Sequence, residues 1–203
     1  MIDAEKTLDN IIEKIQIIDA DDIPSIDLYM DQVTTFMDSH LGNNKRFEDD
    51  KVLTKTMINN YAKNDLLPAP KKKRYTKDHV IMLTYIYYMK NFLSINDIKT
   101  LLKPISERYF DGNNKVSMEE IYKTLSNSEE EMTDFIKSDI TREINKSKEM
   151  FLDNPKKDTD YLQLFALVTG LTYDIYVKKQ MIESIVDQIN KYEEKTSKDK
   201  KKE

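Results

Sequence analysis

Apolar residues recur at steps of three and four along the early part of the chain, the spacing of a helix with one buried face. Ser25 can cap the start of this helix, and Gly42 marks its C-terminal stop. The positions that define the face are Ile26, Tyr29, Met30, Val33, Phe36, Met37 and Leu41. The pattern therefore predicts a first helix that ends before the polar stretch GNNKRFEDDK, which we interpret as a loop.

A second, shorter helix is predicted after this loop, with Thr54 as its N-cap and an end near Asn64. Its apolar side carries Met57, Ile58 and Tyr61. Two prolines, at positions 68 and 70, then disfavour helix in the residues before them, so an extended segment follows. The sequence KKKRY at the end of this segment indicates a loop or a minimal β-wing with a basic tip.

Two further helices are predicted after the basic tip. Thr76 can cap a helix that continues to about Phe92. The spacing of Ser94 and Asp97 matches a capping box that opens a short fourth helix, which Pro104 would terminate. The predicted order is helix, loop, helix, wing, helix, helix.

Beyond Pro104 the sequence predicts helices at about 117–125, 128–152 and 158–193, followed by a frayed Lys-rich tail, TSKDKKKE. The last of these helices carries apolar residues in an a/d heptad frame, interrupted by Lys178. Phe165, Leu167 and Val186 widen the apolar face, so a core helix packed within its own chain is an equal alternative to a dimer seam. The residues of the heptad frame are Tyr161, Leu164, Val168, Leu171, Ile175, Ile182, Ile185, Ile189 and Tyr192.

Charge is distributed unevenly along the chain. Residues 1–50 carry four Lys or Arg against thirteen Asp or Glu, whereas residues 51–103 carry eleven against three. The whole chain has a formal net charge of −5. A basic segment inside an acidic protein points to a local anionic partner, although a solvated charged surface explains the same composition.

Several classes of protein are disfavoured by composition. The chain has no cysteine, which excludes disulfides, thiolate metal sites and cysteine nucleophiles, and which fits a cytoplasmic location. The acidic N-terminus does not resemble a signal peptide, and no stretch of about 18 uncharged apolar residues could cross a membrane.

Metal-dependent and catalytic interpretations have little support. The segment from Asp111 to Glu120 resembles the later part of an EF-hand loop, but Tyr109 would occupy the first ligand position and Asn114 the position of the turn glycine. The two histidines, His40 and His79, lie on separate predicted helices without a nearby acidic pair or nucleophile. No glycine-rich phosphate loop is present. We therefore expect no enzyme activity, no metal site and no cofactor.

The segment LTKTMINNYAKNDLL has the residues that a DNA-reading helix needs. If Ile58 and Tyr61 face inward, its polar residues lie largely on the outer side, where Asn can pair with adenine and Thr with base edges or a thymine methyl. Basic residues at the adjacent wing tip suit phosphates. The alternative is that all of these are ordinary exposed polar residues. The candidate DNA-binding residues are Lys55, Thr56, Asn59, Asn60, Lys63, Lys71, Lys72, Lys73 and Arg74.

This region resembles the DNA-binding head of the MerR family, in which a short recognition helix with paired aromatics leads through a Gly-Leu-Leu-Pro turn to a basic wing ending in Tyr. The resemblance covers roughly 50 residues, and three positions depart from it. Asn59 stands where the family usually has Arg, Asn60 where it has an aromatic residue, and Asp65 where it has Gly. The matching residues are Tyr61, Leu66, Leu67, Pro68, Arg74, Tyr75 and the segment 94–102.

The larger block from IPSIDLYMDQVTTFMD to DIKTLL also resembles an uncharacterised bacterial family, domain of unknown function 1836. This second resemblance covers about half of the chain and implies no established activity.

We therefore predict a mainly α protein with a MerR-like winged helix-turn-helix followed by a C-terminal helical region. The expected divisions are an acidic N-terminal segment (1–24), the winged helix-turn-helix (25–104), a dimerisation or sensor region (105–195) and a tail (196–203). The predicted function is DNA binding by a bacterial transcriptional regulator. The alternative is a protein-interaction adaptor that keeps the winged scaffold but has lost DNA binding, which the acidic net charge favours.

The predicted partners are double-stranded DNA and a second copy of the chain, bound through the C-terminal helices. Aromatic residues in the C-terminal half could line a pocket for a small-molecule effector, although at helical spacing they are equally consistent with a plain core. These residues are Phe135, Phe151, Tyr161, Phe165, Tyr173 and Tyr176.

Overall fold

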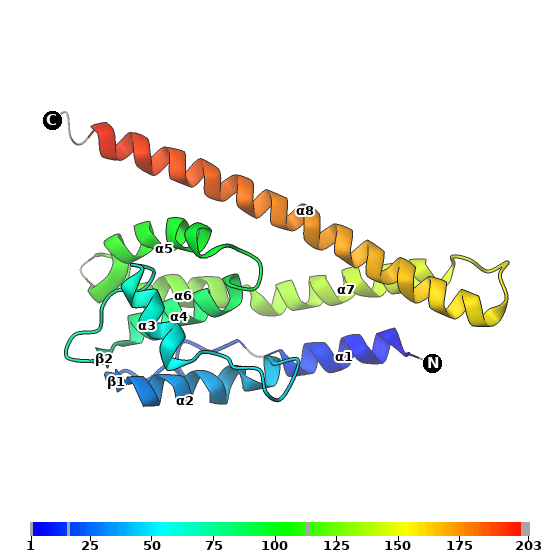
Figure 1. The fold of residues 1–203 in the computed structure, drawn as a ribbon, viewed down its shortest axis with the longest axis horizontal. Helices are drawn as coiled ribbons and strands as arrows, with labels where there is room; N and C mark the ends of the chain where they lie inside the picture. Colours follow the sequence, from blue (N-terminus) through cyan, green and yellow to red (C-terminus); the bar gives the residue numbers. More distant parts are fainter. Residues whose placement is uncertain (1, 16, 113, 200–203) are drawn as a thin grey trace. The chain divides into compact units, whose positions relative to one another are not determined.

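The computed structural model describes residues 2–15, 17–112 and 114–199, and these residues are mainly helical (Figure 1). The two short strands pair antiparallel, with Leu28 opposite Tyr75 and Tyr29 opposite Arg74. The elements in chain order are α1 (Ala4–Lys14), β1 (Leu28–Tyr29), α2 (Met30–Leu41), η1 (Gly42–Asn44), α3 (Lys55–Lys63), β2 (Arg74–Tyr75), α4 (Lys77–Met89), α5 (Ile95–Tyr109), η2 (Phe110–Gly112), α6 (Met118–Ser126), α7 (Glu129–Lys148) and α8 (Lys156–Asp199).

The chain divides into two compact units. Unit 1 consists of residues 1–15 and 128–181, which include α1, α7 and the first part of α8. Unit 2 consists of residues 16–127 and 182–203, which include the other elements and the C-terminal part of α8. The long helix α8 therefore contributes to both units.

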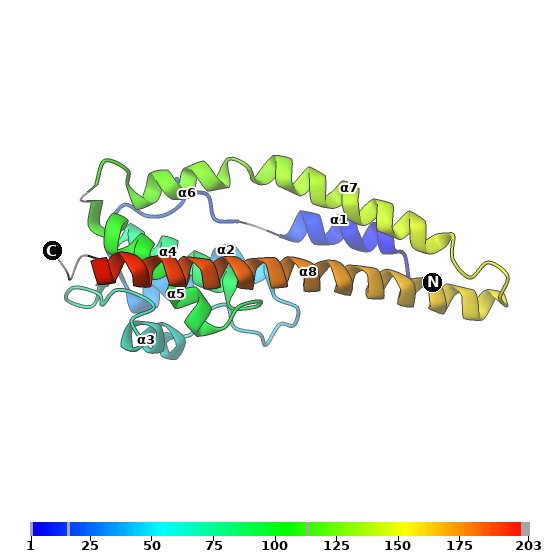
Figure 2. The ribbon, with the colours of Figure 1, turned by 90° about the horizontal axis from the view of Figure 1, so that it is seen from above.

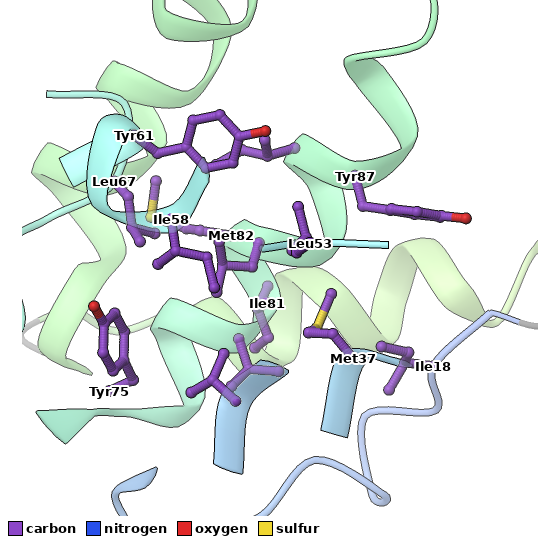
Figure 3. Close-up of a cluster of buried hydrophobic side chains, with 14 of the residues drawn as sticks. Ile18, Met37, Leu53, Ile58, Tyr61, Leu67, Tyr75, Ile81, Met82 and Tyr87 are labelled. Atoms are coloured by element: carbon purple, nitrogen blue, oxygen red, sulfur yellow. The ribbon is translucent and has the colours of Figure 1, made fainter. Parts of the chain in front are cut away.

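Unit 2 is built around α4. Four consecutive residues of this helix, from Val80 to Leu83, are each at most 1% exposed, and four consecutive positions face every side of a helical turn. The neighbouring elements therefore surround α4 instead of covering one face. Ile58 and Tyr61 of α3 and Met37 of α2 point into the same core (Figure 3).

Residues outside the predicted winged head complete this core. Ile18, Ala20 and Ile23 precede β1 and are buried, and Met118 and Tyr122 of α6 are buried in the same core. The Tyr122 hydroxyl donates a hydrogen bond to the Ile18 carbonyl at 2.5 Å. The segment before residue 25, which was predicted to be a separate acidic segment, thus supplies part of the core of unit 2.

Local capping signals located most helix starts correctly. Thr54 caps α3 by accepting from the Met57 N–H, and Ser94 and Asp97 form the predicted capping box of α5. The first helix begins later than predicted, at Met30, and Tyr29 is its N-cap instead of Ser25. Residues 28 and 29 are extended because they pair with β2, so a tertiary contact overrides the helical spacing here.

Pro104 does not terminate α5, contrary to the prediction. The helix continues through this proline to Tyr109, so a boundary at residue 104 falls inside a helix. Proline removes one hydrogen bond from a helix interior, but Leu101, Ile105 and Tyr109 pack against the core and offset that loss. The third predicted helix is shorter than expected, because α4 ends at Met89 and not near Phe92.

Unit 1 contains α1, which the hydrophobic pattern did not predict. Asp3 caps α1 by accepting from the Lys6 N–H at 3.1 Å, and α1 lies beside α7 (Figures 1 and 2). Leu8 of α1 and Ile144 of α7 are buried. Two ion pairs also join these helices, one between Glu5 and Lys148 and the other between Asp9 and Lys137.

The residue ranges of α6, α7 and α8 agree closely with the three helices predicted beyond Pro104. The tail differs, because residues 196–199 belong to α8, and the rest of it, residues 200–203, lies outside the described residues. None of the helices in the described ranges is both long enough and apolar enough to span a membrane.

Candidate nucleic-acid interface

The outer face of α3 carries the polar residues that the sequence singled out. Ile58 and Tyr61 are 0% and 8% exposed because they pack into the core of unit 2 (Figure 3). At 3.6 residues per turn, burial of these two positions turns the opposite side of the helix to solvent. The residues that the structure exposes there are Lys55, Thr56, Asn59, Asn60 and Lys63.

A tight turn connects α3 to the extended segment. Asp65 has a φ of +54°, a left-handed conformation that glycine adopts with least strain. The N–H groups of Leu66 and Leu67 both donate to the Tyr61 carbonyl, at 2.9 and 3.2 Å, and both leucine side chains are buried. This turn fixes the end of α3 and directs the chain toward the basic tip. Asp is among the few residues other than glycine that adopt this conformation readily, because its short polar side chain can bond to nearby backbone groups.

The basic tip, residues 71–74, is a two-residue turn. Arg74 donates its N–H to the Lys71 carbonyl at 3.0 Å, and the two residues form an antiparallel bridge. Lys72 and Lys73, at the centre of the turn, have φ values of +52° and +62°, as a type I′ turn requires. Such turns favour Asn-Gly, and a lysine in this conformation costs about 1 kcal/mol or more. The structure therefore keeps two strained lysines at an exposed turn.

Contacts with the rest of unit 2 hold this turn in place. The Arg74 guanidinium lies over the Tyr29 ring, 5.5 Å from its centroid, which connects the turn to β1. Lys71 Nζ lies 2.6 Å from Asp111 Oδ2, and this hydrogen bond raises the pKa of Lys71. Asp111 in turn donates its backbone N–H to Asp78 at 2.8 Å. The tip is thus exposed but anchored at its base.

All nine predicted DNA-binding residues are exposed, and three of them already have protein partners. Lys55 pairs with Asp31 of α2, Lys71 pairs with Asp111, and Arg74 contacts Tyr29. Exposed ion pairs of this kind contribute little to stability and exchange readily with other anions. The structure therefore leaves these cations accessible to a competing phosphate.

Lysines of α5 extend the basic surface, and sequence reasoning missed them. Lys99 Nζ donates to the carbonyl of Asn64, the C-cap of α3, at 2.8 Å and lies 3.4 Å from Asp65 Oδ2. Lys103 lies one turn further along and pairs with Glu107 at 3.8 Å. Both lysines line a hollow of about 430 Å³ beside the turn after α3, together with Asp65 and Glu107. The spacing of these lysines on the predicted fourth helix is the only sequence signal that could have indicated them. Their proximity to α3 depends on the tertiary fold.

His79 has a structural role at the base of the wing. Its Nδ1 accepts a hydrogen bond from the Thr76 N–H at 3.0 Å, which completes a capping box at the start of α4. The ring is 2% exposed and packs edge-on against Tyr75 and Phe110. Burial lowers the pKa of His79 to about 4, so the ring is neutral near pH 7.

The structure gives no arrangement suited to metal binding among the residues that it describes, where no three His, Cys, Asp or Glu side chains cluster. The aromatic residues proposed to line an effector pocket do not gather in one cavity, although the rings of Tyr161 and Phe165 stack with their centroids 6.5 Å apart. Five of the six lie outside the cavity of about 770 Å³ in unit 1, which Tyr161 lines together with residues of α1 and α7. All six are at least 44% exposed.

Comparison with known proteins identifies the family of the chain. No curated protein and no solved structure matches it. A family model described as "Domain of unknown function (DUF1836)" matches residues 18–125, which is more than half of the chain. This range begins at the first buried residue of the core of unit 2 and ends just beyond the last, Tyr122. The chain therefore belongs to the DUF1836 family.

Proposed function

We propose that this protein binds double-stranded DNA, with α3 in the major groove and the basic tip, residues 71–74, on the phosphate backbone. In this proposal unit 2 acts as a winged helix-turn-helix of the MerR type. The observation that carries the proposal is that the polar and basic side chains of α3 and of the tip are exposed, whereas the apolar side chains beside them are buried. The nine candidate residues face solvent, whereas the neighbouring Ile58, Tyr61 and Tyr75 are in the core.

The chemistry of the two exposed elements is complementary. Asn59 and Asn60 can each form bidentate hydrogen bonds with the adenine edge in the major groove, which is how side chains read sequence. The lysines and arginine of the tip match phosphates, which position a protein on DNA without reading its sequence. The proposed interface therefore has one element for specificity and another for affinity.

Backbone strain at the tip gives independent support. Two lysines adopt a left-handed conformation where Asn-Gly would be relaxed, and such strain is concentrated at functional sites. The positive charge at this turn thus carries a cost in folding stability. We interpret that cost as the consequence of a requirement for cations at the tip.

Lys99 and Lys103 have different roles in this proposal. Lys99 positions α3, because its ammonium group holds the carbonyl at the C-cap of that helix. Lys103 has a side chain that is 61% exposed, and it adds a phosphate contact on the α5 side.

We place the protein among transcriptional regulators, with a small-molecule effector as a further option for its C-terminal region.

A second candidate function is a protein-interaction adaptor on the same scaffold. The ion pairs of Lys55 with Asp31 and of Lys71 with Asp111 favour it, because they neutralise part of the basic surface within the chain. The acidic net charge of −5 also weakens general attraction to nucleic acids.

The decisive experiment replaces the two strained lysines by the residues that the turn prefers, in a Lys72→Asn/Lys73→Gly variant of the full chain. Relief of the positive φ strain should stabilise unit 2 by about 1–2 kcal/mol in urea denaturation. Removal of two cations should weaken binding to all DNA sequences and lower the logarithmic salt slope by about 0.9 for each phosphate that the variant no longer neutralises. Opposite changes in stability and binding would identify the tip as a DNA-binding surface.

A matched control removes the same charge elsewhere. Lys146→Asn/Lys191→Asn changes two exposed lysines of α7 and α8 and should leave the salt slope unchanged. If the tip variant and this control bind genomic DNA fragments as well as the original chain at every salt concentration, the DNA proposal fails and the adaptor function is favoured.

Asn59→Ala and Asn60→Ala test α3 as the element that reads the DNA sequence. Each substitution should reduce the binding free energy at a cognate site by about 1–3 kcal/mol.

A further inference from the structure

A stripe of apolar side chains on α8 faces solvent within unit 1. Tyr161, Phe165, Val168 and Ile175 are 69%, 60%, 59% and 52% exposed, and Thr172 between them is also exposed. These residues follow one another at steps of four, three, four and three, which places them on a single face of the helix. Tyr176, 58% exposed, lies beside the stripe.

The stripe differs from the heptad frame that the sequence predicted. Both share Tyr161, Val168 and Ile175, but the frame combined them with Leu164 and Leu171. The structure leaves those two leucines half-buried, whereas Phe165 and Thr172, one residue further along, are exposed. The outward-facing seam is therefore rotated relative to the predicted one.

Unit 1 also has few buried apolar residues of its own. Among its described residues, Leu8 and Ile144 are the buried apolar side chains, whereas the core of unit 2 contains 25 buried apolar side chains. Large contiguous apolar patches on soluble proteins usually mark interaction sites. The exposed stripe is therefore a candidate interaction surface.

We propose that a second copy of this chain covers the stripe, through antiparallel pairing of the two α8 helices along residues 161–179. Aromatic side chains bury about 150–250 Å² each when fully covered, so the stripe supplies several hundred Å² per chain. A standard interface buries roughly 800 Å² per partner, and the residues flanking the stripe on α8 supply the remainder. This inference does not depend on DNA binding.

The sequence of the stripe favours the antiparallel orientation. With the two helices centred on Gly170, Phe165 lies opposite Ile175 of the second copy, so its large ring meets a smaller side chain, and Val168 lies opposite Thr172, which is of nearly the same size. The same register places residue 179 opposite Tyr161 of the second copy. Parallel pairing would instead place each residue of the stripe opposite its own copy, so Phe165 would meet Phe165.

Engineered cysteines test both the pairing and its direction, because the natural chain has no cysteine. Full-length Tyr161→Cys and Lys179→Cys variants are oxidised separately and as a mixture. Antiparallel pairing predicts a disulfide-linked dimer in the mixture and little in either variant alone, because the two copies of residue 161 would be about 27 Å apart along the axis. Linked dimers of each single variant would show parallel pairing and overturn the proposed orientation. The absence of any linked dimer would overturn the pairing itself.

A charge substitution gives a second, independent readout. Phe165→Asp/Ile175→Asp should reduce the mass measured by light scattering from twice 24.0 kDa to 24.0 kDa. Tyr173→Asp is the matched control, because Tyr173 is as exposed as Tyr161 but lies about a third of a turn away on α8. It should leave the mass unchanged. Helical content measured by circular dichroism establishes that each variant is folded. A monomeric original chain at high concentration, or equal effects of both substitutions, would refute the proposal.

Discussion

Unit 2 and unit 1 use their apolar residues in different ways. Unit 2 buries 25 apolar side chains in one continuous core around α4, whereas unit 1 leaves large residues such as Phe135 and Tyr161 69% exposed. The range matched by the DUF1836 family, residues 18–125, coincides with the core of unit 2. The comparison indicates that unit 2 has a core of its own, while unit 1 is held by fewer contacts and leaves much of its apolar surface exposed.

The comparison also separates two kinds of interaction within the chain. Hydrophobic burial scales with the area removed from water and dominates unit 2. In unit 1, ion pairs such as Glu5–Lys148 and Asp9–Lys137 link α1 to α7, and exposed pairs of this type are individually weak. Unit 1 should therefore open at lower denaturant concentrations than unit 2.

The largest expected effect comes from dividing the chain at the boundaries of the core. Residues 17–127 should fold as a separate fragment, because they contain the whole buried cluster. Residues 23–104, the approximate extent of the predicted winged head, should remain largely unfolded, since this fragment lacks Ile18, Met118 and Tyr122 and interrupts α5. Chemical-shift dispersion and cooperative urea unfolding measure the difference. A cooperative transition in the shorter fragment would show that the flanking segments are not part of the core.

Matched truncations compare the two units directly. Ile81→Ala in α4 removes a side chain that is 0% exposed and should cost about 2–5 kcal/mol. Ile136→Ala in α7, where the isoleucine is 40% exposed, should be close to neutral because little buried apolar area is removed and alanine favours helix. Urea denaturation of both variants provides the test. Similar losses of stability for the two variants would contradict the contrast between the units.

The third effect is a dependence of unit 2 on pH. Because the pKa of His79 falls from 6.5 to about 4 on folding, the unfolded chain binds the extra proton first as the solution is acidified. The contribution of His79 to stability should be complete above pH 6.5 and should decrease by about 3 kcal/mol as the pH falls to 4. Thermal unfolding between pH 4 and 7 measures this decrease.

His79→Gln serves as the control for that titration. Glutamine retains a capping side chain at the third position of α4 but does not titrate. The variant should lack the His79 part of the acid sensitivity while keeping α4 intact. An unchanged pH profile would assign the acid sensitivity to groups other than His79.

The smallest expected effect concerns the ion pairs of unit 1. A double-mutant cycle with Glu5→Gln and Lys148→Gln should give a coupling energy below about 1 kcal/mol, because both side chains are more than half exposed. The coupling should disappear in 1 M salt, where screening acts over roughly 3 Å. A larger, salt-insensitive coupling would mean that unit 1 depends on this pair more than its exposure suggests.

Sequence reasoning succeeded where a structure is fixed by neighbouring residues. The N-caps of α3 and α5, at Thr54 and Ser94, depend on hydrogen bonds across three positions, so they can be recognised directly. The inward positions of α3 also follow from helical spacing, and exposure of the five candidate residues on α3 agrees with it. It failed at Tyr29, where pairing with Arg74 replaces a helical turn by a strand. The lysines of α5 were missed for the same reason, because their position near α3 requires contacts between distant segments.

By itself, then, the sequence determined the mainly helical content, most helix starts and the basic character of one segment. These properties arise from local hydrogen bonding, from the period of the apolar residues and from composition. Only the tertiary structure decided that α5 continues through Pro104, that Ile18 and Tyr122 close one core, and that the exposed stripe of α8 contains Phe165 instead of Leu164. The physical reason is that burial depends on which segments meet in space, and the free energy of that burial can exceed a local preference.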